Sequence, residues 1–158
     1  MKRQGGFTLI EMVVVIVILG ILAVTAAPRF LNLQNDARKS SLEGLKGAVD
    51  GAAGITFGKA AIRGVESKEN GTIKNDNGVD VALAYGYPKA TSGALKSVVN
   101  GLENDWTSQD VANSNPAQIL YSFKENTKWT KGTAECFVEY TQATSSAVAT
   151  TKVFSDNC

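Results

Sequence analysis

The sequence predicts an α+β protein in which one long N-terminal helix packs against a small C-terminal antiparallel sheet. Three observations lead to this prediction. Residues 7–27 are almost entirely apolar, the apolar positions then recur with helical periodicity to about Ile62, and the chain from Gly64 onward is rich in Gly, Asn, Ser and Thr. The 158 residues are enough for one domain with a hydrophobic core.

Composition argues against several classes of function. The 16 Lys and Arg residues nearly balance the 15 Asp and Glu residues, so no charge excess indicates specific binding of nucleic acid. The chain has no histidine, the commonest general base and metal ligand. We therefore expect a protein that is not an enzyme and that has no cofactor and no metal site.

The first apolar run is able to cross a membrane. As a helix, residues 7–27 would span about 31 Å, close to the hydrocarbon thickness of a bilayer. Lys2 and Arg3 precede the run and predict that the N-terminus stays in the cytoplasm while the rest of the chain crosses. Two ordinary interpretations are a secretory signal cut near the small residues of "VTAAP" and an uncut signal anchor. Neither explains Glu11, because a carboxylate inside a membrane is costly and usually functional.

Glu11 requires a cationic partner, and the chain offers a suitable one only after cleavage. A cut between Gly6 and Phe7 would create an α-amino group near Glu11. Between two staggered copies of the chain, this amine and the carboxylate would pair and neutralise each other. Such a pair would also fix the axial register of one copy against the next.

These residues carry a family resemblance. A basic leader ending in Gly6, the sequence "FTLIE" from Phe7 to Glu11, and an apolar run containing Gly20 and Pro28 together resemble the class III signal of type IV pilins. The resemblance implies cleavage after Gly6, N-methylation of Phe7 and a role for Glu11 in aligning each incoming subunit. It also implies that the helix between Gly20 and Pro28 loosens in the filament.

Beyond the apolar run, the helix is expected to be amphipathic at about 100° per residue. Its predicted apolar face holds Phe30, Ala37, Leu45, Ala48, Val49, Ala52 and Thr56, and its charged face holds Arg29, Asp36, Lys39, Glu43, Lys46 and Asp50. A stripe of five glycines runs beside the charged face: Gly44, Gly47, Gly51, Gly54 and Gly58. Each costs about 0.5–1 kcal/mol relative to alanine in a helix interior. Two explanations remain open, namely close packing of the head on the helix and close approach of a neighbouring subunit.

The head is expected to combine turns, one short helix and strands. "ENGT" and "NDNGVD" predict turns, and "GVDVALAYGYP" predicts an extended stretch. "SGALKSVVNGL", residues 92–102, predicts a helix with Asn100-Gly101 near its C-cap. "AECFVEYTQA" and "AVATTKVF" alternate in the manner of strands.

The chain has two cysteines, Cys136 and Cys158. Because their number is even and the N-terminus looks like that of an exported protein, a disulfide is favoured over two unrelated buried thiols. The bridge would close a loop of about 23 residues and contribute about 3 kcal/mol. In type IV pilins a C-terminal disulfide frames a variable, solvent-facing region, so the resemblance implies the same for residues 136–158. "LKGAVDGAAGITFGKAAIRGVES" and "YGYPKAT" resemble the mannose-sensitive haemagglutinin group of these pilins.

The resemblance implies a cleaved leader (1–6), a transmembrane and assembly half of the helix (7–28), an amphipathic half (29–63) and a globular head (64–158). The implied function is a structural subunit of a type IV pilus used for surface attachment. Its implied partners are other copies of the chain, a prepilin peptidase and methyltransferase, the inner-membrane assembly machinery with minor pilins, and surface glycans. The precursor would lie in the inner membrane with a periplasmic head, and the mature protein in an extracellular filament.

Two other functions remain open. A pseudopilin of a type II secretion system shares this N-terminus but usually lacks the C-terminal disulfide and often binds calcium near that end. A signal-anchored periplasmic enzyme or binding protein is disfavoured by the missing histidines and catalytic motifs. "NDNGVD" has too few acids for a calcium loop. The aromatic residues able to stack on sugars are Trp106, Trp129, Tyr85, Tyr87, Tyr121 and Tyr140.

Overall fold

A computed structural model describes residues 6–156 and residue 158, except for the side chains of residues 27–32 and 134. The basic residues Lys2 and Arg3, on which the expected orientation depends, lie outside the described residues. The described chain forms two compact units, residues up to Ala37 and residues Arg38–Cys158. We describe each unit by itself.

Helix α1 covers Leu9–Ile62, 54 residues, which confirms the prediction of one long helix ending near Ile62. Its C-terminus has a physical cause. Gly64 has a φ of 65°, its N–H donates to the Ala61 carbonyl at 3.1 Å, and the N–H of Val65 donates to the Ala60 carbonyl at 3.0 Å. This pair of bonds is the Schellman arrangement, which favours glycine because the residue after the helix is left-handed. Val65 then packs against Ala60.

The first sheet of the head has three antiparallel strands in the order β1-β2-β3, namely β1 (Gly71–Lys74), β2 (Asp80–Ala84) and β3 (Tyr87–Pro88). The predicted turn "NDNGVD" joins β1 to β2, and the Asn75 side chain accepts bonds from the N–H groups of Asn77 and Val79. The expected extended stretch over residues 78–88 is a hairpin instead. Its chain reverses at Tyr85 and Gly86, which both have positive φ.

The second sheet has four antiparallel strands in the order β4-β5-β8-β9. They are β4 (Trp106–Asp110), β5 (Gln118–Phe123), β8 (Phe137–Thr141) and β9 (Thr150–Phe154). Strands β8 and β9 confirm the two predicted from alternation, whereas β4 and β5 were not predicted. A small hairpin of β6 (Trp129–Thr130) and β7 (Ala134–Glu135) lies between β5 and β8 in the sequence. Its Lys131 pairs with the buried carboxylate of Glu139 on β8.

The single helix expected over residues 92–102 was wrong. Helix α2 covers only Ser92–Lys96 and is capped by the Thr91 hydroxyl, and α3 covers Leu102–Asp105. Gly101, expected near a C-cap, is instead the N-cap of α3 with a φ of 79°. Val99 and Leu102 are buried on either side of this break, so the segment bends to place both in the core.

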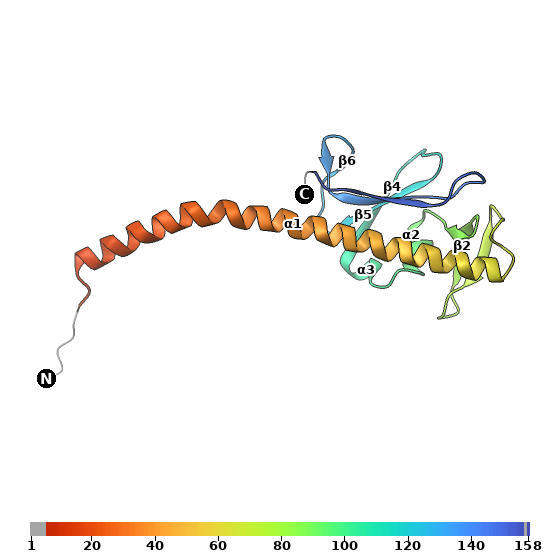
Figure 1. The fold of residues 1–158 in the computed structure, drawn as a ribbon, viewed down its shortest axis with the longest axis horizontal. Coiled ribbons are helices and arrows are strands. Elements are labelled where there is room, and N and C mark those ends of the chain that lie inside the picture. The colour runs from red at the N-terminus through yellow and green to blue at the C-terminus, as the bar shows by residue number, and fades with distance from the viewer. Residues whose placement is uncertain (1–5, 157) are drawn as a thin grey trace. The chain divides into compact units, whose positions relative to one another are not determined.

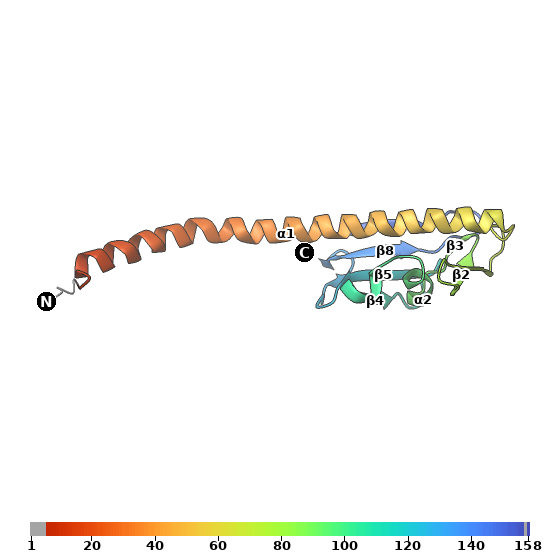
Figure 2. The same ribbon diagram turned by 90° about the horizontal axis from the view of Figure 1, so that it is seen from below.

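The core of the head lies between the C-terminal part of α1 and the four-stranded sheet (Figures 1 and 2). Leu42, Leu45 and Val49 of α1 pack in one cluster with residues of β5 and β8 such as Ile119 and Val138. The buried face of α1 is rotated by about 60° from the predicted one at about 100° per residue. Ala48, expected inside, is therefore exposed, while Leu42, Ala53 and Ala60 are buried.

Candidate functional site

The N-terminus of α1 is organised by Thr8 and Glu11. The Thr8 N–H and the Thr8 hydroxyl both donate to Oε2 of Glu11, at 2.7 and 2.8 Å. The Glu11 N–H in turn donates to the Thr8 hydroxyl oxygen at 3.3 Å. Because α1 begins at Leu9, Thr8 is its N-cap and Glu11 is its third residue. This reciprocal exchange is a capping box, which satisfies two N–H groups at the helix start.

Sequence reasoning gave Glu11 only an intermolecular purpose and missed this local one. The signal was present, because Ser or Thr followed three residues later by Glu, just before an apolar run, is the signature of a capping box. The cap uses a single oxygen of the carboxylate, since both bonds from Thr8 end on Oε2. Oε1 of Glu11 therefore stays available to accept a bond from a cation.

Gly6 and Phe7 precede the helix and are exposed, with the Phe7 side chain 86% accessible. A peptide bond between two exposed residues ahead of a helix is open to a protease. The structure thus places the predicted junction, Gly6-Phe7, directly before the capping box. It does not test cleavage or methylation there.

The segment Leu9–Ala26 of α1 is long and apolar enough to cross a membrane, with a mean hydropathy of 2.8. None of its residues is buried by the rest of the described chain. Gly20 lies within this segment, and a Cβ placed there would meet no atom within 4 Å. The backbone of Pro28 belongs to α1, and its side chain lies outside the described part. The loosening of the helix between these two residues stays a prediction.

The glycine stripe does not pack against the head. The buried face of α1 holds Leu42, Leu45, Val49, Ala53, Thr56 and Ala60. Gly44, Gly47, Gly51, Gly54 and Gly58 lie about half a turn away from it at about 100° per residue. A Cβ on any of the five would meet no described atom within 4 Å outside the neighbouring helix backbone. Of the two explanations for the stripe, packing of the head is therefore excluded for the part of the chain described.

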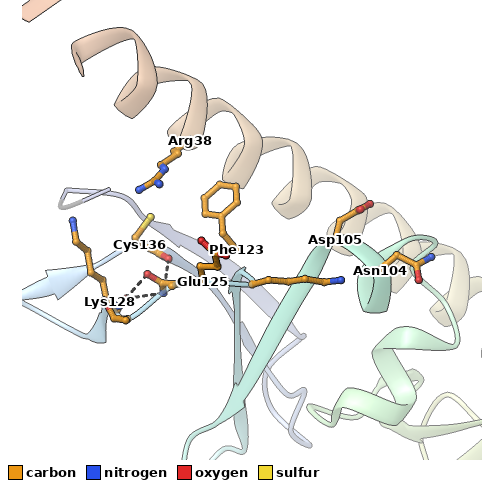
Figure 3. Close-up of a pocket in the computed structure, with 10 residues that line it drawn as sticks. Arg38, Asn104, Asp105, Phe123, Glu125, Lys128 and Cys136 are labelled. Carbon is orange, nitrogen blue, oxygen red and sulfur yellow. Dashed lines mark hydrogen bonds between the residues drawn. The ribbon is translucent and has the colours of Figure 1, made fainter. Parts of the chain in front are cut away.

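The disulfide joins Cys136, just before β8, to Cys158. The Arg38 guanidinium donates to the Cys158 carbonyl at 3.0 Å and lies over the Phe123 ring at 5.9 Å from its centroid. Arg38, Phe123 and Cys136 are among the residues that line an open cavity (Figure 3). Its volume is about 520 Å³. The disulfide therefore ties residue 158 to the start of β8, and the Arg38 hydrogen bond ties it to α1. Arg38 contacts both the Cys158 carbonyl and the Phe123 ring, so we assign this cavity to the anchoring of the C-terminal residue.

The aromatic residues noted in the sequence divide into buried and accessible ones. Tyr121 and Tyr140 are buried, and burial raises the pKa of both hydroxyls. The Tyr140 hydroxyl donates to the Pro88 carbonyl at 2.7 Å, so this residue links β8 to β3. Tyr85 and Tyr87 are half-buried at the β2–β3 turn. Within the described chain, no group of three or more His, Cys, Asp or Glu side chains is placed to share a metal ion.

Residues 1–27 match the family described as the prokaryotic N-terminal methylation motif. The chain is also similar to the type IV narrow pilus major component PilA5 of Thermus thermophilus, with 45% identity over 53 residues, 34% of this chain and 46% of the relative. The chain is 37% identical to fimbrial protein Q of Moraxella bovis over 98 residues, 62% of this chain and 59% of the relative. A third relative is the type II secretion system core protein G of Klebsiella pneumoniae, 46% identical over 54 residues, 32% of this chain and 39% of the relative.

The chain thus spans between about two fifths and three fifths of the length of these relatives. The alignment with the Moraxella protein covers 98 residues, and α1 ends at Ile62, so the alignment extends into the head. No solved structure matches significantly. The motif and the pilus proteins among these relatives confirm the resemblance to type IV pilins. These relatives are structural subunits and not enzymes. Resemblance to the mannose-sensitive haemagglutinin subgroup stays a prediction.

Proposed function

We propose that this chain, a type IV pilin by its N-terminal motif and its relatives, is a structural subunit of a surface filament used for attachment. The observation that carries the proposal is the combination found at the start of α1. An exposed Gly6-Phe7 junction precedes an apolar helix that carries an acid, Glu11, in its first turn and that nothing else in the described chain covers. A membrane, and then a bundle of like helices, would supply the missing apolar surroundings.

Maturation follows from the motif. A prepilin peptidase and methyltransferase would remove residues 1–6 and methylate Phe7. The rest would act as an assembly segment (7–28), an amphipathic helix (29–63) and a head (64–158). The precursor would wait in the inner membrane with its head in the periplasm. The assembly machinery and minor pilins would then draw it into an extracellular filament.

Assembly would use the free oxygen of Glu11. Its Oε2 holds the N-cap of its own helix, while Oε1 is left to accept a bond from the α-amine of Phe7 on a neighbouring copy. The two functions of the carboxylate are therefore compatible. Pairing an acid and an amine in an apolar bundle sets axial register, which apolar packing alone does not do.

The glycine stripe supports contact between subunits along the second half of α1. It faces away from the head, and Ile55 and Ile62 on the same side are 66% and 88% exposed. Small residues let two helix backbones approach closely, and exposed isoleucines gain from burial. A helix of a neighbouring copy would supply that burial and offset the low helix propensity of five glycines.

A second candidate is a pseudopilin of a type II secretion system, because one relative is a core protein of such a system. That similarity covers 32% of this chain. The Cys136–Cys158 bridge favours the pilus, since pseudopilins usually lack it. Negative-stain microscopy of cells that produce the protein separates the two functions: long surface filaments support the pilus, and bare cells with secretion that depends on the protein support the pseudopilin.

A further inference from the structure

The sequence contains three pairs of asparagine followed by glycine, and the proposed filament function accounts for none of them. They are Asn70-Gly71, Asn77-Gly78 and Asn100-Gly101. The first leads into strand β1, the second lies in the turn between β1 and β2, and the third joins α2 to α3. Asparagine is a chemically labile residue, and a glycine after it adds to the lability because no Cβ shields the glycine nitrogen.

The chemistry is a ring closure within the chain that needs only water. The glycine nitrogen attacks Cγ of the asparagine and gives up its proton, the side-chain amide leaves as ammonia, and a succinimide ring forms. A water molecule then opens the ring at either of its carbonyls and leaves aspartate or isoaspartate. The attack requires that the glycine N–H makes no hydrogen bond and that the asparagine side chain is free to turn, so local structure sets its rate.

The pair at Asn77 is protected by its own turn. The Gly78 N–H donates to the Asn75 carbonyl at 3.0 Å. The side-chain oxygen of Asn75 accepts bonds from the N–H groups of Asn77 and Val79, at 3.0 and 2.9 Å, which holds the backbone around the pair. The nitrogen of Gly78 is therefore engaged, and a hydrogen bond must break before it can attack.

The pair at Asn70 is protected at both of its residues. The Lys89 ammonium donates to Oδ1 of Asn70 at 2.5 Å, which holds the asparagine side chain. Gly71 is buried as the first residue of β1, where it pairs with Leu83 of β2. Ring closure here would have to release the side chain from Lys89 and distort the start of the strand.

The pair at Asn100 has neither protection. Asn100 and Gly101 are both exposed. Within the residues that the structure describes, neither the Asn100 side chain nor the Gly101 N–H makes a hydrogen bond. Gly101 has a φ of 79° and a ψ of −3°, which match the third residue of a type II turn, and the N–H of that residue has no partner within the turn. Glycine favours this conformation because it has no Cβ, so the residue that shapes the turn also leaves its nitrogen open.

We propose that Asn100 is the site of a spontaneous deamidation, which converts it to aspartate or isoaspartate in the folded head. Isoaspartate adds a methylene to the backbone between Val99 and Leu102, whose side chains are both buried in the core. Aspartate adds a charge to a cavity of about 240 Å³ that Asn100 shares with the Lys59–Asp76 ion pair. The modified head should be less stable, chiefly through isoaspartate, because two well-packed side chains must shift.

The direct test follows the purified full-length chain in detergent during incubation in a mildly alkaline buffer. Peptide mapping by mass spectrometry reports each pair separately, because replacement of the side-chain NH2 by OH adds one dalton, and an isoaspartyl methyltransferase labels the isoaspartate. We expect conversion at Asn100 to be about fivefold faster than at Asn77 or Asn70, the factor that one hydrogen bond supplies. Equal rates at the three pairs, or faster conversion at Asn77 or Asn70, would overturn the proposal.

The same chain unfolded in urea is the control for local sequence. The three pairs should then convert at similar rates, because the hydrogen bonds that protect two of them are lost. If Asn100 kept its lead in the unfolded chain, the residues beside it in sequence rather than the fold would set the rate, and the assignment to the turn would be wrong.

Two matched variants connect the reaction to stability. Asn100→Gln keeps an exposed amide but reacts far more slowly, because its longer side chain has to close a larger ring. Its melting temperature should stay constant during the incubation, while that of the parent and of the control Asn77→Gln should fall by a few degrees. An equal fall in all three proteins would show that Asn100 is not the residue whose change destabilises the head.

Filaments sheared from young and old cultures provide a second arm. The modified fraction at Asn100 should rise with age, because a subunit in an extracellular filament is not replaced; this expectation alone rests on the proposed filament function. Conversion in detergent with no filaments on the cells would reject the filament function and leave the reaction standing. Filaments at every age without modified Asn100, together with an inert Asn100 in detergent, would do the reverse.

Discussion

The two halves of α1 have different surroundings within the described chain. Apart from Glu11 and Thr25, the segment Leu9–Ala26 is apolar on all sides, and none of it is buried. From Arg38 to Ile62, by contrast, one face is buried in the core of the head and the opposite face is lined by exposed glycines. An all-apolar helix needs apolar surroundings on every side, whereas an amphipathic helix needs them on one. The first half thus depends on a membrane or on other copies, and the second already has a partner on one side.

The largest expected effect comes from the charged residue of the first half. Glu11→Val should still insert in the membrane, because it removes a charge that is costly there, and it should still be cut after Gly6, because the junction itself is unchanged. It should form no filaments, or short ones, since the register contact is lost. Electron microscopy of the filaments and the mass of the processed protein measure the two effects separately.

Thr8→Ala is the matched control for this prediction. It removes the hydroxyl that caps the helix but keeps the carboxylate, so filaments should persist. Abundant full-length filaments from Glu11→Val would contradict the role of the carboxylate in register. Loss of filaments in Thr8→Ala as well as in Glu11→Val would mean that the helix cap, and not the register contact, is what assembly needs.

In the second half, the core residues govern the stability of the head. Leu42 is fully buried, and Leu42→Ala should lower the free energy of unfolding by about 2–5 kcal/mol through lost contacts and a cavity. Ala48→Ser, on the exposed side of the same helix, should change it by less than about 0.5 kcal/mol. Chemical denaturation followed by tryptophan fluorescence provides the comparison. Similar effects of the two variants would refute the assigned buried face.

The disulfide should have a somewhat smaller effect. Replacing both Cys136 and Cys158 by serine should lower the free energy of unfolding of the head by about 2–4 kcal/mol, because the unfolded chain is no longer constrained. Membrane insertion should not change, since the bridge lies in the second unit. Non-reducing peptide mapping of the parent should show the 136–158 link, and two free thiols would contradict it.

The smallest effect on stability is expected at the glycine stripe. Gly51→Ala should raise the stability of the head by about 0.5–1 kcal/mol, because alanine favours the helix and its Cβ meets no atom. Gly51→Leu should leave the head equally well folded yet reduce filament yield, because a large side chain keeps a neighbouring helix away. Normal filaments from Gly51→Leu would show that the stripe is not a contact between subunits.

How much the sequence predicts differs between these regions. The extent of α1 was predictable because Gly64 ends the periodic pattern and adopts the left-handed conformation that the helix end requires. The capping box was readable from Thr8 and Glu11 but was overlooked. The rotation of the buried face was not predictable from periodicity alone, since Ala48 and Ala53 are equally apolar and only the position of the sheet selects between them.

Strands β4 and β5 could not be predicted because of their local sequences. Strand β4, "WTSQD", is polar and mostly accessible, so its alternation is too weak to read. Strand β5, "QILYSF", is buried on both faces in its middle and shows no alternation at all. The turn at Tyr85 was missed because tyrosine is not a turn residue. These last elements depend on tertiary contacts that no short stretch of sequence specifies.

The central claim is that the chain is cut between Gly6 and Phe7 and exported into a filament. Mass spectrometry of the material sheared from the surface of producing cells tests it most directly. The account predicts a protein that begins at Phe7, carries one added methyl group on its N-terminus and contains the Cys136–Cys158 bridge. A sheared protein that retains Met1, or one cut near "VTAAP", would contradict the account.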